Sequence, residues 1–141
     1  MIGTATISSG KPKVNEEWGS SCTRFLEKVR RHKSHASESY YWKNHVQYFD
    51  GLYASLRESR RVLRPSGQCV LVAQDSYYKE VRNDLPASVT EMAKSLGLSL
   101  KRRYDYQVDH TFAGMHPHRK TYRTHSHAVE SVLWFAREGA V

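Results

Sequence analysis

The sequence predicts an α/β fold in which helices and strands alternate along the chain. Apolar residues recur at helical spacing over residues 45–63, and this pattern ends before Pro65 and Gly67. The next residues, QCVLVAQ at 68–74, form an uninterrupted apolar strand, as expected for a strand buried on both faces of a parallel sheet. A second helix, a strand, a polar loop and a final strand follow, which completes the alternating order.

The composition is that of a globular domain, because 39% hydrophobic residues is too apolar for a disordered chain. A length of 141 residues provides for one domain with one core. The longest uncharged apolar run, 69–73, is too short to cross a bilayer, and the N-terminus has no apolar signal segment, so a cytoplasmic location is expected. Cys22 and Cys69 have no metal-ligand spacing and are expected to be free thiols in a reducing compartment.

The charge favours a polyanionic partner. The chain has a formal net charge of +8 and a pI near 9.6, and cationic proteins gain affinity for nucleic acids by releasing counterions. Many small basic proteins bind no nucleic acid, so this observation supports a DNA or nucleotide partner without establishing one.

The N-terminal part of the chain has one short predicted helix. Residues 1–20 have no periodicity and are expected to form a loop or an unpaired tail. From Ser21 onward, Phe25, Leu26 and Val29 form the apolar side of a basic helix. The longer helix then begins near His45, and Asn44 is the residue that we expect to cap it.

The C-terminal part contains the second helix and two further strands. Asp84 is expected to cap this helix, Pro86 fits its first turn, and Gly97 ends it. Strands at 98–108 and 128–136 flank a long polar loop at 109–127. Three strands are few, and a buried parallel strand needs neighbours on both sides and helices on both faces. The chain is therefore expected to be part of a sheet whose other strands lie elsewhere.

One stretch resembles a known signature. Residues 48–76, YFDGLYASLRESRRVLRPSGQCVLVAQDS, resemble the helix and fifth strand of class I S-adenosylmethionine-dependent methyltransferases, with Ser66 in place of the middle residue of the usual Pro-Gly-Gly. Residues 32–49, 72–97 and 118–136 are similar to the prokaryotic methylases that modify the exocyclic amino group of cytosine or adenine in DNA. The resemblance covers almost the whole chain, from Met1 to Arg137.

The resemblance implies a partial Rossmann-like sheet made of the family's fifth, sixth and seventh strands with flanking helices. The seventh strand would insert between the fifth and sixth, so that 128–136 would return against 98–108. Residues 1–44 would be an N-terminal loop with a short basic helix, and residues 45–141 the C-terminal half of a methyltransferase domain.

Two motifs of this family have no counterpart in the chain. The Gly-rich turn that receives the cofactor carboxylate is absent, and none of the four prolines belongs to a Pro-Pro-Tyr loop of the kind that holds a flipped base. The resemblance therefore implies a truncated gene, a split protein or a remnant. The missing N-terminal half would hold S-adenosylmethionine, and this chain, with no catalytic or cofactor-binding residue of its own, would be inactive alone. The alternatives are a basic module that binds nucleic acid or completes another polypeptide, and a remnant of a small-molecule methyltransferase.

The candidate rim of the active site is Asp75, Ser76 and Tyr77. These residues follow the strand at 68–74, and open α/β sheets bind ligands beyond the carboxyl ends of their strands. Tyr77 and Tyr78, next to Lys79, suit stacking on nucleic acid. The alternatives are that Asp75 caps a turn and that the tyrosines pack over the next helix.

The candidate nucleic-acid contacts lie in three segments. Lys43 adjoins the aromatic run Tyr40–Trp42 and is either a phosphate contact or a solvated lysine. The loop at 109–127 contains five histidines, but no cysteine or carboxylate pattern completes a zinc site, so no metal is expected and a basic surface facing DNA is favoured. The full set of predicted contacts is Lys43, Lys79, Arg119, Lys120 and Arg123.

Overall fold

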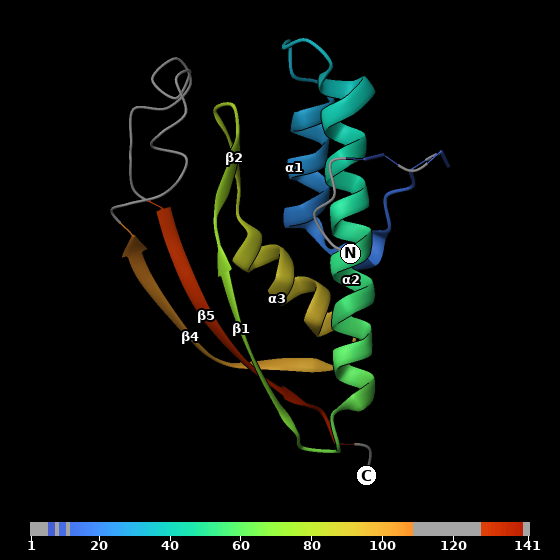
Figure 1. Ribbon diagram of the computed structural model, residues 1–141. Helices are drawn as coiled ribbons and strands as arrows, with labels where there is room; N and C mark the ends of the chain where they lie inside the picture. The colour runs from blue at the N-terminus through green and yellow to red at the C-terminus, as the bar shows by residue number, and fades with distance from the viewer. Residues whose placement is uncertain (1–5, 8, 11, 109–127, 140–141) are drawn as a thin grey trace.

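The computed structural model describes residues 6, 7, 9, 10, 12–108 and 128–139, and shows helices and strands in a mixed α/β arrangement (Figure 1). The helical elements are the 3-10 turn η1 (Glu16–Trp18), α1 (Ser20–Arg30), the π-helical segment η2 (Ser37–Trp42), α2 (Lys43–Val62) and α3 (Leu85–Ser95). The strands are β1 (Gln68–Gln74), β2 (Ser76–Tyr78), β3 (Val81–Asn83), β4 (Leu98–Val108) and β5 (Ala128–Arg137).

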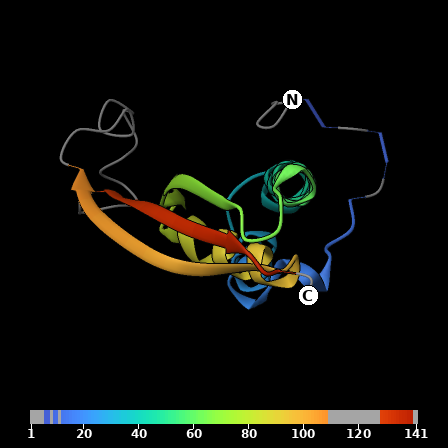
Figure 2. The same ribbon diagram turned by 90° about the horizontal axis from the view of Figure 1, so that it is seen from below.

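The main sheet has the strand order β1-β5-β4, and β5 is antiparallel to both neighbours. β1 and β4 therefore run in the same direction, with β5 between them. Among the described residues no two adjacent strands are parallel. Figures 1 and 2 show α3 against one face of this sheet, with α1 and α2 on the far side of α3.

The other face of the sheet is open, which corrects the expectation that strand 68–74 is buried on both sides. Val70 pairs with Trp134, and Val72 pairs with Val132, so these side chains share a face. Val70 and Val72 are 56% and 60% exposed because no described element covers them. We call this surface the open face; its residues are Val70, Val72, Tyr104, Tyr106, Val132 and Trp134.

A single hydrophobic core joins the two ranges into which we divided the chain. Residues before 45 contribute Phe25 and Leu26 to it, and residues after 45 contribute Phe49, Met92 and Phe135. The apolar face predicted for the first helix is confirmed, and Cys22, which is fully buried, extends it. Both cysteines are free, as expected.

The N-terminal segment is more ordered than its composition predicts. Residues 16–18 form η1, and Trp18 is completely buried, so the expected loop ends before residue 20. Glu91 of α3 then caps the first turn of α1, accepting hydrogen bonds from Ser21 N (2.9 Å) and Ser21 Oγ (2.7 Å). Gly19 permits this approach because its φ is +88° and a Cβ there would lie 2.2 Å from Glu91 Oε2.

Asn44 does not cap α2, contrary to the expectation. The residue before α2 is Trp42, whose backbone is already helical, and no side chain caps the helix there. The reason is that η2 runs directly into α2, so the helix has no separate N-terminus to cap. The predicted cap of α3 is confirmed, since Asp84 accepts a hydrogen bond from Ala87 N (3.2 Å) and Gly97 follows with φ +77°.

The chain leaves α2 through a tight turn at residues 64–67. Gly67 N donates to Arg64 O (2.8 Å), and Ser66 has φ +60°, a left-handed conformation that glycine adopts with less strain. Ser66 therefore introduces local strain in this turn.

Ser66→Gly is expected to raise the free energy of unfolding by up to about 1 kcal/mol, since the left-handed penalty of about 1–2 kcal/mol exceeds the added chain entropy of glycine. Gly67→Ala is the matched control. It should lower the free energy of unfolding, because the added Cβ would lie 2.7 Å from Arg64 O. Urea titration monitored by circular dichroism measures both. A Ser66→Gly variant less stable than the parent chain would contradict the turn geometry.

The strand at 98–108 follows its predicted bounds, but its alternation is interrupted. A register shift lies between Leu100 and Arg102, so the residues beyond it pair with β5 on the opposite face from their expected one. Leu98 is buried, whereas Tyr104 and Tyr106 are 44% and 56% exposed on the open face.

The hairpin formed by β2 and β3 was not predicted. Tyr78 pairs with Val81, so only Lys79 and Glu80 form its tip, and Lys79 has φ +54°. This hairpin begins directly after β1 and positions the candidate site.

Candidate nucleic-acid interface

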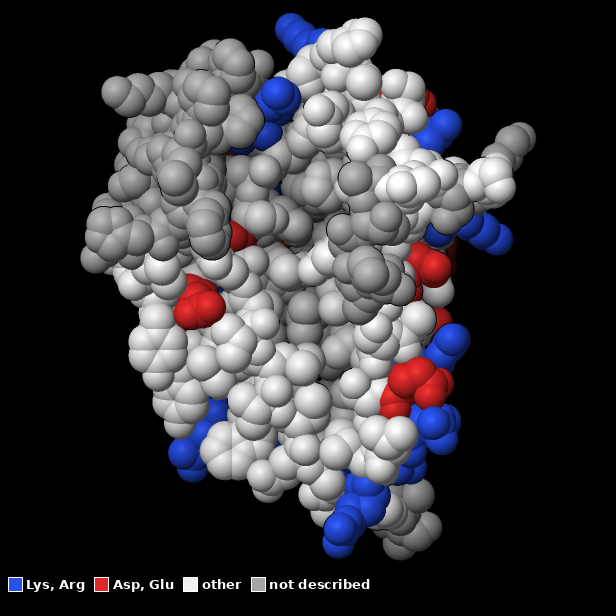
Figure 3. All heavy atoms as spheres, in the orientation of Figure 1, with Lys and Arg blue, Asp and Glu red and all other residues white. Residues whose placement is uncertain are grey.

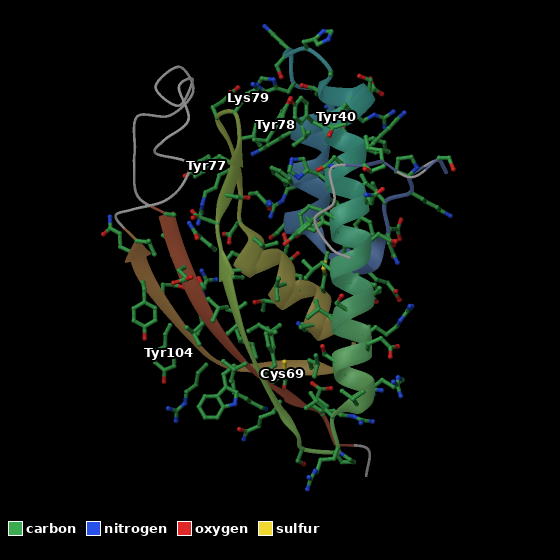
Figure 4. The ribbon with its side chains drawn as sticks, in the orientation of Figure 1. Tyr40, Cys69, Tyr77, Tyr78, Lys79 and Tyr104 are labelled. Carbon is green, nitrogen blue, oxygen red and sulfur yellow. The ribbon has the colours of Figure 1, made fainter. Side chains whose placement is uncertain are left out.

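The structure brings together two aromatic segments, whose contacting residues Tyr41 and Tyr78 are 37 positions apart in the sequence. The ring centroids of Tyr41 in η2 and Tyr78 in β2 are 5.3 Å apart, and those of Tyr40 and Tyr41 are 5.1 Å apart. Figure 4 shows Tyr78 directed toward η2, while Tyr77 lies on the other side of the hairpin. We call this region, formed by η2, the hairpin and the C-terminal end of α1, the tyrosine end.

Three hydroxyl groups connect the hairpin to the first residue of η2 and to the segment before it. The Tyr78 hydroxyl lies 2.6 Å from Ser37 Oγ and 2.7 Å from Ser34 Oγ, and the two serine oxygens are 2.8 Å apart. Ser37 and Tyr78 are both buried, so these hydrogen bonds replace the water that the hydroxyls lose on folding.

A histidine and a glutamate extend this network to the surface. Ser34 N donates to His32 Nδ1 (3.0 Å), which makes Nδ1 an acceptor and leaves Nε2 as the donor of this ring. His32 Nε2 is 2.8 Å from Glu80 Oε1 at the hairpin tip. A hydrogen bond from the backbone of Glu80 and the bond from His32 lower the pKa of the Glu80 carboxyl, so Glu80 accepts from His32 as a carboxylate.

Tyr78→Phe is expected to lower the free energy of unfolding by about 1–2 kcal/mol, because it removes two hydrogen bonds and leaves the buried Ser37 hydroxyl with fewer partners. Tyr106→Phe, at a side chain that is 56% exposed, is the matched control and should leave stability unchanged. Both are measured by urea denaturation. Equal midpoints for the two variants would show that the hydroxyl network does not hold the hairpin.

His45 lies beneath the tyrosine end, in α2. Its ring is 5.0 Å from that of Phe25 and 6.0 Å from that of Tyr78, both edge-on. Burial lowers the pKa of His45 to about 4, because the charged imidazolium would lose its hydration among these rings. His45 is thus neutral at pH 7 and acts as an aromatic packing residue.

A groove of about 610 Å³ runs between the end of α1 and β3. Of its acidic residues, Glu27 is ion-paired with Arg31 (2.5 Å), and Glu80 is hydrogen-bonded to His32 (2.8 Å). Lys28 and Lys33 also line it, and neither has a carboxylate partner in the part of the chain that the structure describes. The groove therefore has an excess of positive charge. In the face shown in Figure 3, Lys and Arg lie mostly at the ends and margins, and the middle is largely uncharged.

The predicted rim residues serve the connection between sheet and hairpin. Asp75 is buried; its carboxylate accepts from Val129 N (2.8 Å) and Arg82 Nε (3.1 Å), and its own N–H donates to Val129 O (3.0 Å). Ser76 is exposed, and its Oγ accepts from the Asn83 side chain (3.1 Å). Asp75 thus connects the end of β1 to β5 and to the hairpin through hydrogen bonds. This role is close to the alternative from the sequence, in which Asp75 caps a turn.

The predicted basic contacts are dispersed. Lys79 is at the hairpin tip, within the tyrosine end. Lys43 lines a separate cavity of about 300 Å³ between α2 and the N-terminal segment, together with Lys13 and Asp50. Arg119, Lys120 and Arg123 lie outside the described residues, as do the five histidines of their loop.

Sequence reasoning missed His32, Ser34, Ser37 and Glu80. Their bonds join positions as far as 48 residues apart, and nothing in the local pattern at either position indicates the other. Within the described ranges, no group of three or more histidine, cysteine, aspartate or glutamate side chains is placed to hold a metal ion, and no helix is long and apolar enough to span a bilayer.

No protein-family model, curated protein or solved structure matches this chain.

Proposed function

We propose that this chain supplies the C-terminal part of an S-adenosylmethionine-dependent methyltransferase that acts on an exocyclic amino group of a DNA base. The observation that carries the proposal is the sheet: β5 runs in reverse between β1 and β4, which point the same way. The helix α2 precedes β1, and α3 connects β1 to β4. This is the arrangement that the resemblance of residues 48–76 implies for the family's fifth, sixth and seventh strands.

The open face supports a partner segment that completes the fold. Val70 and Val72 of β1 are more than half exposed, and the other edge of β1 has no strand partner among the described residues. If β1 takes the place of the fifth strand, the family's remaining strands continue from this edge and their helices cover the open face. A partner of this kind buries the apolar side chains that the chain alone exposes to water.

The described residues do not fit the cofactor. At the end of β1, the Asp75 carboxylate already accepts hydrogen bonds from Val129 and Arg82. In addition, none of the described turns is a Gly-rich loop that leads into the N-terminus of a helix. S-adenosylmethionine supplies the methyl group in this chemistry, and in our proposal the partner segment binds it. Calorimetry of the purified chain alone should therefore detect no binding of S-adenosylmethionine; a micromolar dissociation constant would contradict this assignment.

Deletion of the gene in its source organism tests the activity. Mass spectrometry of nucleosides from genomic DNA should show loss of N4-methylcytosine or N6-methyladenine, and a plasmid copy should restore it. Unchanged amounts of both modified bases in the deletion strain would overturn the proposal.

A second function, a non-catalytic basic module that binds nucleic acid, is favoured by the tyrosine end and its lysines. Under this function the deletion leaves base methylation unchanged while the purified chain binds nucleic acid. The two experiments together therefore separate the two functions.

A further inference from the structure

The tyrosine end presents two adjacent aromatic rings to solvent. Tyr40 and Tyr41 are 38% and 40% exposed, so part of each ring is accessible to a ligand. Their rings meet edge to face at 88°, and Tyr41 rests on Tyr78, whose hydroxyl is fixed by Ser34 and Ser37. The exposed ring of Tyr41 therefore packs against a side chain whose position is fixed by hydrogen bonds.

An irregular backbone places the two tyrosines. Ala36 begins η2 with φ +61°, and its carbonyl accepts hydrogen bonds from both Tyr40 N (3.0 Å) and Tyr41 N (3.1 Å). The wider π-helical turn is rare in proteins and is frequently found at functional sites. It places consecutive rings shortly before the first residue of α2, and both remain more than one third exposed.

The third aromatic residue of this segment is already covered. The guanidinium of Arg30 lies 5.1 Å from the centroid of a Trp42 ring, and Arg30 is also bonded to Glu38 (3.0 Å). Stacking of an external ring is therefore expected on Tyr40 and Tyr41 and not on Trp42.

The charges around the tyrosines suit a polyanion. Of the acidic side chains at this end, Glu27 and Glu38 are each ion-paired with an arginine, and Glu80 is hydrogen-bonded to His32. Lys28 and Lys33 have no carboxylate partner among the described residues and line the groove beside the hairpin. The groove reaches the tyrosines through His32, which lines it and whose ring lies 5.4 Å from that of Tyr78. Lysines at the same end of the molecule as exposed aromatic rings are a combination that proteins use for single-stranded nucleic acid.

We propose that the tyrosine end binds single-stranded DNA, with unpaired bases stacked on Tyr40 and Tyr41 and phosphates beside Lys28 and Lys33. A duplex stacks its base faces on one another and leaves only their edges accessible, so exposed tyrosine rings favour an unpaired strand. This contact lies beyond methyl transfer and does not depend on it, because it needs neither cofactor nor partner segment.

The test is fluorescence anisotropy of the full chain with three labelled ligands: a thymidine strand of about 12 nucleotides, an abasic strand of the same length, and a duplex. The abasic strand has the same phosphates and no bases. The thymidine strand should bind at least about 10-fold more tightly than the abasic strand, since stacking of each base contributes 5-fold or more. Equal affinity for these two strands would overturn the proposal.

Variants locate the site. The double variant Tyr40→Ala, Tyr41→Ala should lose about 10-fold in affinity for the thymidine strand and keep its affinity for the abasic strand. Tyr40→Phe with Tyr41→Phe keeps the rings and should bind like the parent chain. Lys28→Ala with Lys33→Ala should weaken both strands and reduce the salt dependence of binding.

The matched control for position is Tyr104→Ala with Tyr106→Ala, which removes two comparably exposed tyrosines from the open face. It should bind the thymidine strand like the parent chain. If this control loses affinity and the Tyr40, Tyr41 variant does not, the site is the open face and the proposal is wrong. Because no methylation is measured, failure here leaves the proposed transferase function standing, and failure of the deletion experiment leaves this site standing.

Discussion

Trp18→Ala is expected to lower the free energy of unfolding by about 3–5 kcal/mol, as found for large aromatic residues removed from protein cores. Trp18 is completely buried, and its ring centroid lies 6.3 Å from that of Phe49 in α2. Its backbone belongs to η1, which also contacts α3. The substitution leaves a cavity where η1, α2 and α3 meet, and a small domain has a total stability of only about 5–15 kcal/mol.

Trp18→Phe separates the effect of the cavity from the loss of the indole N–H. Trp18 Nε1 is buried without a hydrogen-bond partner in the described structure, so its removal costs no bond, and the phenylalanine variant should be clearly more stable than the alanine variant. Urea denaturation followed by far-ultraviolet circular dichroism measures both. An alanine variant within about 1 kcal/mol of the parent chain would show that Trp18 does not pack as described.

Acidification from pH 7 to pH 5 is expected to remove about 2 kcal/mol of stability through His45. The unfolded histidine has a pKa of 6.5, and burial lowers the pKa of His45 in the folded chain to about 4. Between these values the unfolded chain binds a proton that the folded chain does not, so stability falls as the pH falls through this window. Above pH 6.5 the contribution is fully retained, and below pH 4 the folded chain also takes up the proton.

His45→Phe keeps a ring between Phe25 and Tyr78 and removes the titration. Between pH 7 and pH 5, the parent chain should lose about 2 kcal/mol more of its free energy of unfolding than this variant does. The carboxylates stay ionised over most of this range, so the difference between the two chains isolates His45. Parallel pH profiles would show that His45 is hydrated in the folded protein.

Helical periodicity predicted α1, α2 and α3 and the residues that they bury, because a helix repeats its apolar face within a few residues. The cap at Asp84 and the stop at Gly97 were predicted for the same reason, since capping is local chemistry. Asn44 shows the limit of this reasoning: its position suits a cap, but the π-helical turn before it leaves no helix N-terminus.

The hairpin of β2 and β3 was missed because each strand has three residues, too few for an alternating pattern. Trp18 was missed because its burial depends on α2 and α3, which lie far along the chain. The open face was also missed, since a continuous apolar run does not show whether one or both faces of a strand are covered. Val70 and Val72 have the same sequence character as buried strand residues.

The sequence by itself determined the order of α1, α2, β1, α3, β4 and β5, the basic charge, and the two aromatic segments that include Tyr40 and Tyr78. These features depend on residues within a few positions of one another, so they can be read without knowledge of the fold. Only the tertiary structure decided that the ring of Tyr41 contacts that of Tyr78 and that His32 forms a hydrogen bond with Glu80. The same holds for the Asp75 carboxylate, which accepts hydrogen bonds from Val129 and Arg82. Each of these contacts forms when strands and helices pack, and packing distances do not follow from separation in the sequence.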